Sequence, residues 1–269
     1  MKPVKVALVV QNCIAGKFEK NFEVSCQFIS AAAQKGAKII VFPEMNLTGY
    51  VAGKDIISIS KSLDKETTDP FSNLAKDLNI AILVGLAEKT HKKNIYASHL
   101  VFYPDGSFDV YRKIHTSPFE KKYFTAGNNI TIFKSQGLKF GVQLCYDAHF
   151  PELSLAMALK KTDIIFIPHA SPRGNSQKKY NSWMRHLRSR AFDNGLYIAA
   201  CNQTGNNSKG LSFPGICLLI GPDGNVIYKS INNTEGLHII DIDKTVLEQV
   251  RSHKMRYFLP NRRSDLFKF

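Results

Sequence analysis

The amino-acid sequence predicts an α/β fold in which mixed β-sheets are covered by helices on their outer faces. Short runs rich in β-branched and aromatic residues recur along the chain, and amphipathic stretches of helical period separate several of them. Turn dipeptides, notably Asp105-Gly106 and Asp223-Gly224, join other runs that must reverse direction. Helices between strands favour parallel pairs and hairpins add antiparallel ones, so we expect mixed sheets in an α/β sandwich.

The predicted elements extend from the first residues to near the C-terminus. About a dozen apolar runs are predicted as strands, at residues 4–10, 38–42, 80–86, 95–103, 108–111, 130–133, 140–144, 163–168, 196–201, 216–220, 226–228 and 237–240. Apolar residues at helical spacing predict helices at 18–34, 70–78, 151–159, 180–194 and 244–250. No linker-like segment or change of composition divides the 269 residues, so we predict one domain over residues 1–269.

The ends of the apolar runs and the cysteines indicate a soluble cytoplasmic protein. The N-terminal run stops at the polar residues Gln11 and Asn12 without a cleavage pattern, which favours a first strand over a signal peptide. The other apolar runs are far shorter than the roughly 20 residues that a membrane-spanning helix needs. Five cysteines, without a CxxC motif or zinc-type pairing with histidine, predict no disulfide framework, no metal site and no cofactor.

The chain is strongly basic, with 36 Lys and Arg against 22 Asp and Glu and a formal net charge of +14. Such a charge raises the question of a nucleic-acid partner. The basic residues are scattered in pairs such as Lys92-Lys93 and Lys178-Lys179, and no recognised nucleic-acid motif accompanies them. We therefore favour a basic solvated surface, with neither nucleic acid nor membrane as a partner.

Three predicted strands end at a polar residue that is followed by a loop, the position where α/β proteins build their sites. Glu44 follows the strand of KIIVFPEMNLTGY, where apolar neighbours would raise its pKa and suit it to act as a general base. Lys113 ends the strand of FDVYRKIHT, and its charge suits the stabilisation of a thiolate or an oxyanion. Taken alone, each residue is better explained as an ordinary surface charge, and Lys113 more so than Glu44.

Cys145 ends the third of these strands, LKFGVQLCYDAHFPEL, just before a predicted helix. Backbone N–H groups at a strand-to-helix turn favour a thiolate and form an oxyanion hole. A buried, inert cysteine is the alternative interpretation, and it is the one we prefer for the other cysteines, at positions 13, 26, 201 and 217.

Taken together, the segments FPEMNLTGY, YRKIHT and CYDAHFPE resemble the Glu-Lys-Cys signatures of the nitrilase superfamily. The resemblance continues in FEKKYFTAG, which is similar to the segment with the family's additional active-site glutamate, here Glu120. It extends through DIIFIPHASP and SRAFDNGLYIAACNQTG to the tail YFLPNRRSDLF, and so covers essentially the whole chain. It implies a four-layer αββα sandwich that assembles into homodimers or larger homo-oligomers, with residues 251–269 as a tail that contributes to oligomer contacts.

The same resemblance implies a role for each residue of the site. Glu44 takes the thiol proton and Cys145 attacks the carbonyl carbon, while Lys113 and the Tyr146 N–H hold the oxyanion. Ammonia leaves, and water hydrolyses the thioester-like acyl-enzyme. Glu120 positions Lys113 or the amino group of the substrate.

The residues around the nucleophile indicate the substrate class. Nitrile-hydrolysing members typically have Cys-Trp-Glu here, whereas Cys145-Tyr146-Asp147 resembles the amidase and carbamoylase branches. We therefore expect cleavage of a non-peptide C–N bond in a small amide or an N-carbamoyl amine. Six residues are candidates for substrate binding, each with a structural role as its alternative: Tyr50, Tyr146, His149, His169, Ser171 and Asn202.

Several alternatives stay open at this point. A cysteine-histidine pair would use His149 or His115 in place of Glu44. A glutaminase that feeds ammonia to a synthetase would need a separate partner protein. A nitrilase would use the same three residues on a nitrile, and a non-catalytic basic binding protein would have no chemical need for them.

Overall fold

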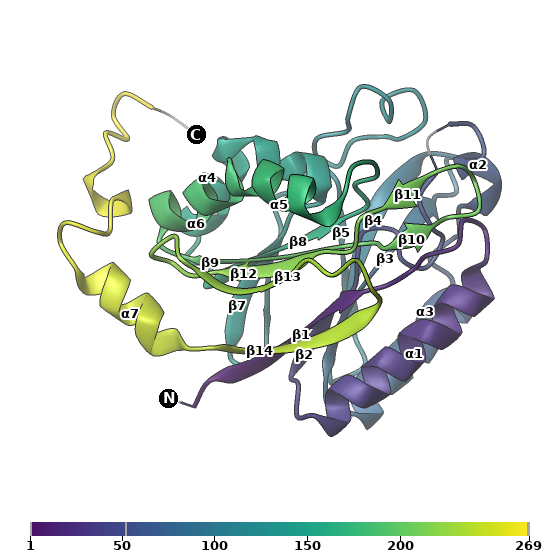
Figure 1. Ribbon diagram of the computed structural model, residues 1–269, viewed down its shortest axis with the longest axis horizontal. Helices are drawn as coiled ribbons and strands as arrows, with labels where there is room; N and C mark the ends of the chain where they lie inside the picture. The colour runs from purple at the N-terminus through teal and green to yellow at the C-terminus, as the bar shows by residue number, and fades with distance from the viewer. Residues whose placement is uncertain (1, 52, 268–269) are drawn as a thin grey trace.

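The structure, a computed structural model, describes residues 2–51 and 53–267 and contains two six-stranded mixed sheets (Figure 1). The first sheet has the order β14-β1-β2-β3-β4-β5 and the second the order β13-β12-β9-β8-β7-β6. The central strands of each sheet are parallel, and the outer ones pair antiparallel. The prediction of mixed sheets is confirmed.

The first sheet is buried on both faces, because apolar residues occupy successive positions along its central strands. Val6, Leu8 and Val10 of β1 belong to the core between the two sheets, whereas Ala7 and Val9 pack toward the helices. The strands of this sheet are β1 (Val4–Val10), β2 (Ile39–Val41), β3 (Ala81–Lys89), β4 (Ile95–Phe102), β5 (Phe108–Arg112) and β14 (Gly236–Ile242).

The second sheet packs against the first through contacts of β1 with β9 and β12. Its strands are β6 (Ile132–Ser135), β7 (Leu138–Val142), β8 (Ile164–His169), β9 (Tyr197–Asn202), β12 (Cys217–Ile220) and β13 (Val226–Ser230). The short strands β10 (Gly205–Asn206) and β11 (Ser212–Phe213) form a separate hairpin. Because no strand joins both sheets among the described residues, they form two distinct layers.

Helices complete the outer layers, as Figure 1 shows: α1 (Phe18–Gln34) and α3 (Lys65–Asp77) lie on one side of the paired sheets, and α4 (Pro151–Leu159), α5 (Ser176–Met184) and α6 (Leu187–Asn194) on the other. The result is the four-layer αββα sandwich that the sequence motifs implied. The remaining helices are α2 (Ile56–Ile59), α7 (Lys244–Ser252) and the 3₁₀ turns η1 (Cys145–His149) and η2 (Leu259–Asn261).

Two predicted helices have different bounds in the structure. The helix expected at 70–78 begins earlier, because the Asp64 side chain accepts a hydrogen bond from Thr67 N at 3.0 Å and caps the first turn. The helix expected at 180–194 is two helices, α5 and α6, separated at Arg185 and His186. The short elements α2, β10 and β11 were not predicted, because they have too few residues to show a periodic pattern.

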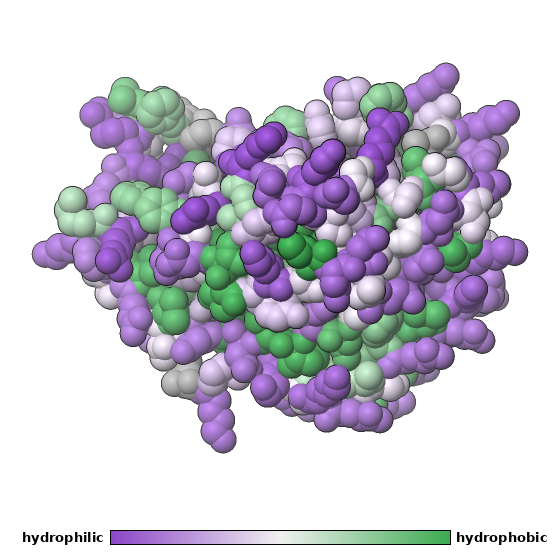
Figure 2. Space-filling view, viewed as in Figure 1, coloured by the Kyte–Doolittle hydropathy of each residue, from purple (hydrophilic) through white to green (hydrophobic). Residues whose placement is uncertain are grey.

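The C-terminal segment begins with α7, which packs on the sandwich through the buried side chains of Leu247 and Val250, and the residues after it extend along one side of the body in Figure 1. Large apolar side chains in this segment are exposed, namely Met255, Phe258, Leu266 and Phe267. Elsewhere on the face of Figure 2, hydrophilic side chains are spread broadly among smaller apolar areas. Within the described ranges, no helix has both the length and the apolar character that a membrane crossing requires.

Candidate active site

Four of the residues predicted to be catalytic lie in one pocket. Glu44, Lys113, Glu120 and Cys145 all line a cavity of about 290 Å³ at one end of the sandwich. They come from different parts of the chain: the loop after β2, the end of β5, the turn after β5, and the start of η1. The strand-end positions that the sequence singled out therefore converge in space.

The loop after β2 is held firmly against β3. Met45 adopts a left-handed backbone with φ of 53°, which turns the chain directly after Glu44. The Asn46 side chain then accepts a hydrogen bond from Gly85 N at 2.7 Å. Gly85 has to be glycine, because a Cβ there would lie 2.6 Å from Met45 N. From the second sheet, the Gln203 side chain donates to the Glu44 carbonyl oxygen at 2.7 Å, so both sheets fix the position of Glu44.

A buried ion triad forms the floor of the pocket. Lys113 Nζ donates to Glu44 Oε1 at 2.8 Å and to Glu120 Oε1 at 2.9 Å. The second oxygen of each carboxylate accepts a backbone N–H, from Ala170 at 2.9 Å for Glu44 and from Ser117 at 2.7 Å for Glu120. These side chains are at most 5% exposed. Buried charges are stable only when paired and hydrogen-bonded in this way.

The environment shifts the protonation of three groups. Burial raises the pKa of Glu44, with Lys113 acting in the opposite direction. Burial by itself lowers the pKa of Lys113, but Glu44 and Glu120 outweigh it and raise this pKa well above the usual value, so the lysine stays cationic. The pKa of the Cys145 thiol is raised by burial and by Glu44, while Lys113 and Lys179 lower it. Burial and Glu44 therefore favour the neutral thiol form of Cys145.

Cys145 begins a tight turn that a single carboxylate organises. Its backbone is left-handed, with φ of 43°, a strained conformation that costs on the order of 1 kcal/mol. The fully buried Asp147 holds this turn: one of its oxygens accepts from Leu144 N at 3.0 Å and from the Tyr111 hydroxyl at 2.8 Å. The other oxygen accepts from His115 N at 2.7 Å and faces His115 Nδ1 at 3.0 Å.

Asp147 thereby ties the nucleophile to the lysine, since Tyr111 and His115 flank Lys113 along the chain. Our sequence analysis used Asp147 only as part of the branch pattern and missed this role. The signal was present, because a carboxylate two residues after a nucleophile and inside an apolar segment needs several donors. His115 is a candidate in the cysteine-histidine alternative, but its backbone N–H and its Nδ1 both contact Asp147.

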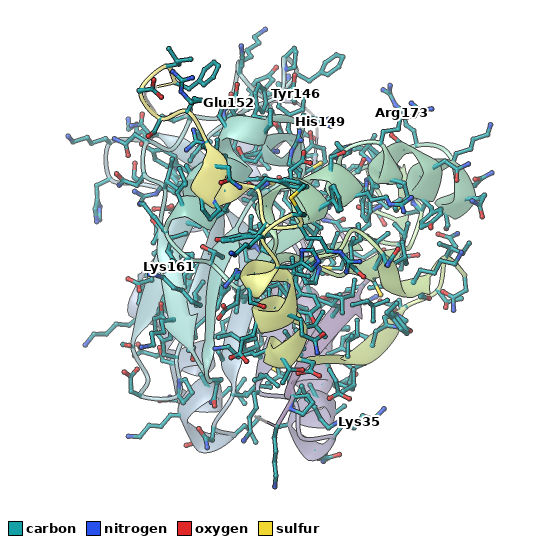
Figure 3. The ribbon with its side chains drawn as sticks, turned by 90° about the vertical axis from the view of Figure 1, so that its left-hand side faces the viewer. Lys35, Tyr146, His149, Glu152, Lys161 and Arg173 are labelled. Carbon is teal, nitrogen blue, oxygen red and sulfur yellow. The ribbon has the colours of Figure 1, made fainter. Side chains whose placement is uncertain are left out.

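Three of the six substrate-binding candidates line the pocket: Tyr50, Tyr146 and Ser171. The other residues that line the pocket are Ser117, Phe119, Ala170, Pro172, Arg173 and Leu211. Figure 3 shows Tyr146 and His149 close together on the turn that follows β7, with Arg173 at the same end of the molecule and directed outward.

The other three candidates, His149, His169 and Asn202, are not among the described residues that line the pocket. The His169 ring stacks on Trp183 at 3.9 Å between centroids, and its Nδ1 faces Ile167 O at 2.7 Å. His149 packs against the His186 ring, 4.4 Å away between centroids. Asn202 hydrogen-bonds to both Ser171 N and Ser171 O and so braces the loop that lines the pocket. These side chains support the wall from behind, and they are not among the described residues that line the cavity.

The glutamates at the floor of the pocket do not suit a metal ion, because Lys113 occupies one oxygen of each and a backbone N–H occupies the other. Across the described residues, no cluster of three or more His, Cys, Asp or Glu side chains has a geometry that would hold a metal.

Comparison with known proteins extends the resemblance seen in the motifs. The Carbon-nitrogen hydrolase family matches residues 5–252. A nitrilase from Pyrococcus abyssi is 30% identical over 268 residues, which cover 98% of this chain and 99% of that protein. An omega-amidase from Homo sapiens is 28% identical over 277 residues, with 99% and 98% covered. The crystal structure of a carbon-nitrogen hydrolase from Helicobacter pylori G27 has a TM-score of 0.88 at 27% identity and covers 100% of this chain and 99% of that one.

The fold and the pocket therefore define a hydrolase-type α/β sandwich with a buried Glu-Lys-Glu triad and a cysteine. The family match covers nearly the whole chain, so the protein belongs to the carbon-nitrogen hydrolase family of the nitrilase superfamily.

Proposed function

We propose that the protein hydrolyses a small amide or an N-carbamoyl amine through a thioester on Cys145. The observation that carries this proposal is the pocket in which Cys145 lies with a buried Lys113 held between two glutamates. Family membership and an omega-amidase relative support amide cleavage. Retention of a buried ion triad argues against a binding-only role, because burying three charges without a chemical use for them costs stability.

In the first half-reaction, Glu44 takes the proton of the Cys145 thiol as the sulfur attacks the carbonyl carbon. Glu44 suits this role because its raised pKa brings it closer to neutral pH. The oxyanion forms beside the Lys113 ammonium and the N–H groups of the first turn of η1, such as that of Tyr146. The carbon–nitrogen bond breaks, Glu44 returns its proton to the leaving nitrogen, and ammonia departs from a primary amide.

In the second half-reaction, Glu44 takes a proton from a water molecule while the oxygen of that water attacks the thioester carbon. The carbon–sulfur bond then breaks, the sulfur regains a proton, and the carboxylic acid leaves. Glu120 contacts neither sulfur nor carbonyl carbon in this scheme. Its contact with Lys113 keeps the ammonium directed at the oxyanion position while Glu44 gains and loses its proton.

The walls of the pocket favour a short substrate. A cavity of about 290 Å³ accommodates only a small molecule, near the lower end of the usual range for ligand pockets. Tyr50 and Leu211 offer apolar surface, whereas Ser117 and Ser171 offer hydroxyl groups. The C(=O)–N substrate is preferred over a nitrile on the basis of the Cys145-Tyr146-Asp147 pattern.

Ammonia release from a panel of N-carbamoyl amines, N-carbamoyl amino acids, omega-amides, glutamine and nitriles tests the proposal. We expect turnover of at least one amide or carbamoyl compound, abolished by Cys145→Ala. Glu44→Gln should also abolish acyl-enzyme formation while the protein stays folded. Turnover of nitriles alone would favour a nitrilase, and near-normal turnover by Glu44→Gln would contradict the assignment of the base.

A further inference from the structure

A second lysine lies just behind the wall of the pocket. Lys179 of α5 donates from Nζ to Ser171 Oγ at 2.8 Å and to Pro172 O at 3.1 Å. Both acceptors belong to the 170–172 loop, which follows β8 and lines the pocket. Lys179 is partly buried, and within the described part of the chain it forms no ion pair with a carboxylate.

The loop that Lys179 holds also binds the base. Ala170 N–H donates to Glu44 Oε2 at 2.9 Å, and Ser171 and Pro172 follow directly in the chain. A shift of this loop therefore moves a hydrogen-bond donor of the Glu44 carboxylate. Asn202 holds Ser171 from the other side, so the loop is fixed between β9 and α5.

The charge of Lys179 also acts on the nucleophile. Four charged groups influence the Cys145 thiol: Glu44 and Glu120 raise its pKa, whereas Lys113 and Lys179 lower it. The floor of the pocket contains the Glu44 and Glu120 carboxylates but only one ammonium, that of Lys113. Its net charge is therefore negative when all three groups are ionised.

We propose that Lys179 is a positioning residue of the reaction: it ties the 170–172 loop to α5 and so holds the Ala170 N–H against Glu44, the base that takes the Cys145 proton. The inference deepens the proposed function, because it concerns the same nucleophile and base. It adds a residue that neither the motifs nor the lining of the pocket identifies.

Alkylation of Cys145 by iodoacetamide, followed from pH 6 to pH 10 by mass spectrometry of the Cys145 peptide, tests this role. The half-buried Cys26 serves as an internal reference in the same sample. Lys179→Met should slow the alkylation of Cys145 at pH 7 by roughly tenfold, because the loop that holds the Ala170 N–H on Glu44 is released and reacting groups are sensitive to small displacements. Lys179→Arg should restore the profile. Lys178→Met, which removes an exposed neighbouring charge on α5, should leave it unchanged.

A Lys179→Met profile that coincides with that of the unaltered protein would overturn the proposal. So would slower alkylation that Lys179→Arg fails to restore. If Lys179→Met does not fold, Lys179→Gln serves the same test, since its side chain is shorter than that of lysine. Alkylation requires no amide turnover, so the slowing is measurable even if the substrate panel releases no ammonia.

Discussion

Replacement of Asp147 by Asn tests how the nucleophile turn is held. The carboxylate has four close contacts with donor groups, two at each oxygen. Asparagine keeps one oxygen and must direct its NH₂ group at the two donors on the other side. Two charge-assisted bonds are then lost, at about 1.5–3 kcal/mol each, so we expect a destabilisation of roughly 3–6 kcal/mol.

Urea unfolding measures this loss, and Asp109→Asn is a matched control because the exposed Asp109 accepts a hydrogen bond from the hydroxyl of the half-buried Tyr103 at 2.8 Å. The control should change stability by less than about 1 kcal/mol. Under conditions where Asp147→Asn stays folded, alkylation of Cys145 should slow by roughly a hundredfold, because small displacements of reacting groups have effects of that size. A loss of less than about 1 kcal/mol in the variant would refute the reasoning.

Three further changes follow from buried contacts. Glu120→Gln removes one of the two anions on Lys113, so kcat should fall by about tenfold or more with a smaller change in KM; an unchanged kcat in steady-state ammonia release would contradict this role. Gly85→Ala places a Cβ 2.6 Å from Met45 N and should destabilise the protein by about 1–3 kcal/mol in urea unfolding, and a neutral result would show that the loop yields easily. Burial lowers the pKa of His99 from 6.5 to about 3, so the unfolded state binds a proton that the folded state does not, and stability falls as the pH drops below 6.5. His99→Leu should therefore regain about 2 kcal/mol between pH 7.5 and pH 5, relative to the unaltered protein; equal acid sensitivity of both proteins would exclude His99 as a cause.

The fold was largely predictable because its signals are local. The strands of both sheets appear in the sequence as apolar runs, and α1 coincides with its amphipathic stretch. The helix break at Arg185 and His186 was not visible, because the hydrophobic period continues across it. The start of α3 was missed because a cap from Asp64 determines it, and the apolar pattern begins only later.

The site was predictable only in part, because only some of its residues belong to local sequence motifs. Glu44, Lys113 and Cys145 stand at strand ends within recognisable motifs, and the structure brings them into one pocket. The contributions of Asp147 and Lys179 depend on hydrogen bonds between distant segments, which spacing in the sequence does not reveal.

His169 and Asn202 show that a position at the end of a strand does not by itself place a side chain in the lining of the pocket. Both end buried strands, as the catalytic residues do, but their side chains turn to Trp183 and to the 170–172 loop. A strand-end position therefore predicts proximity to the pocket, and the direction of the side chain decides whether the residue lines it.

Rapid-quench mass spectrometry tests the central claim most directly. The protein is mixed with the panel compound that releases ammonia fastest, quenched in acid, digested and mapped. We expect an acyl group on the peptide that contains Cys145, formed before the acid product appears and absent in Cys145→Ala and Glu44→Gln. Turnover by Cys145→Ala, or an acyl group carried by any other residue, would contradict hydrolysis through a thioester on Cys145.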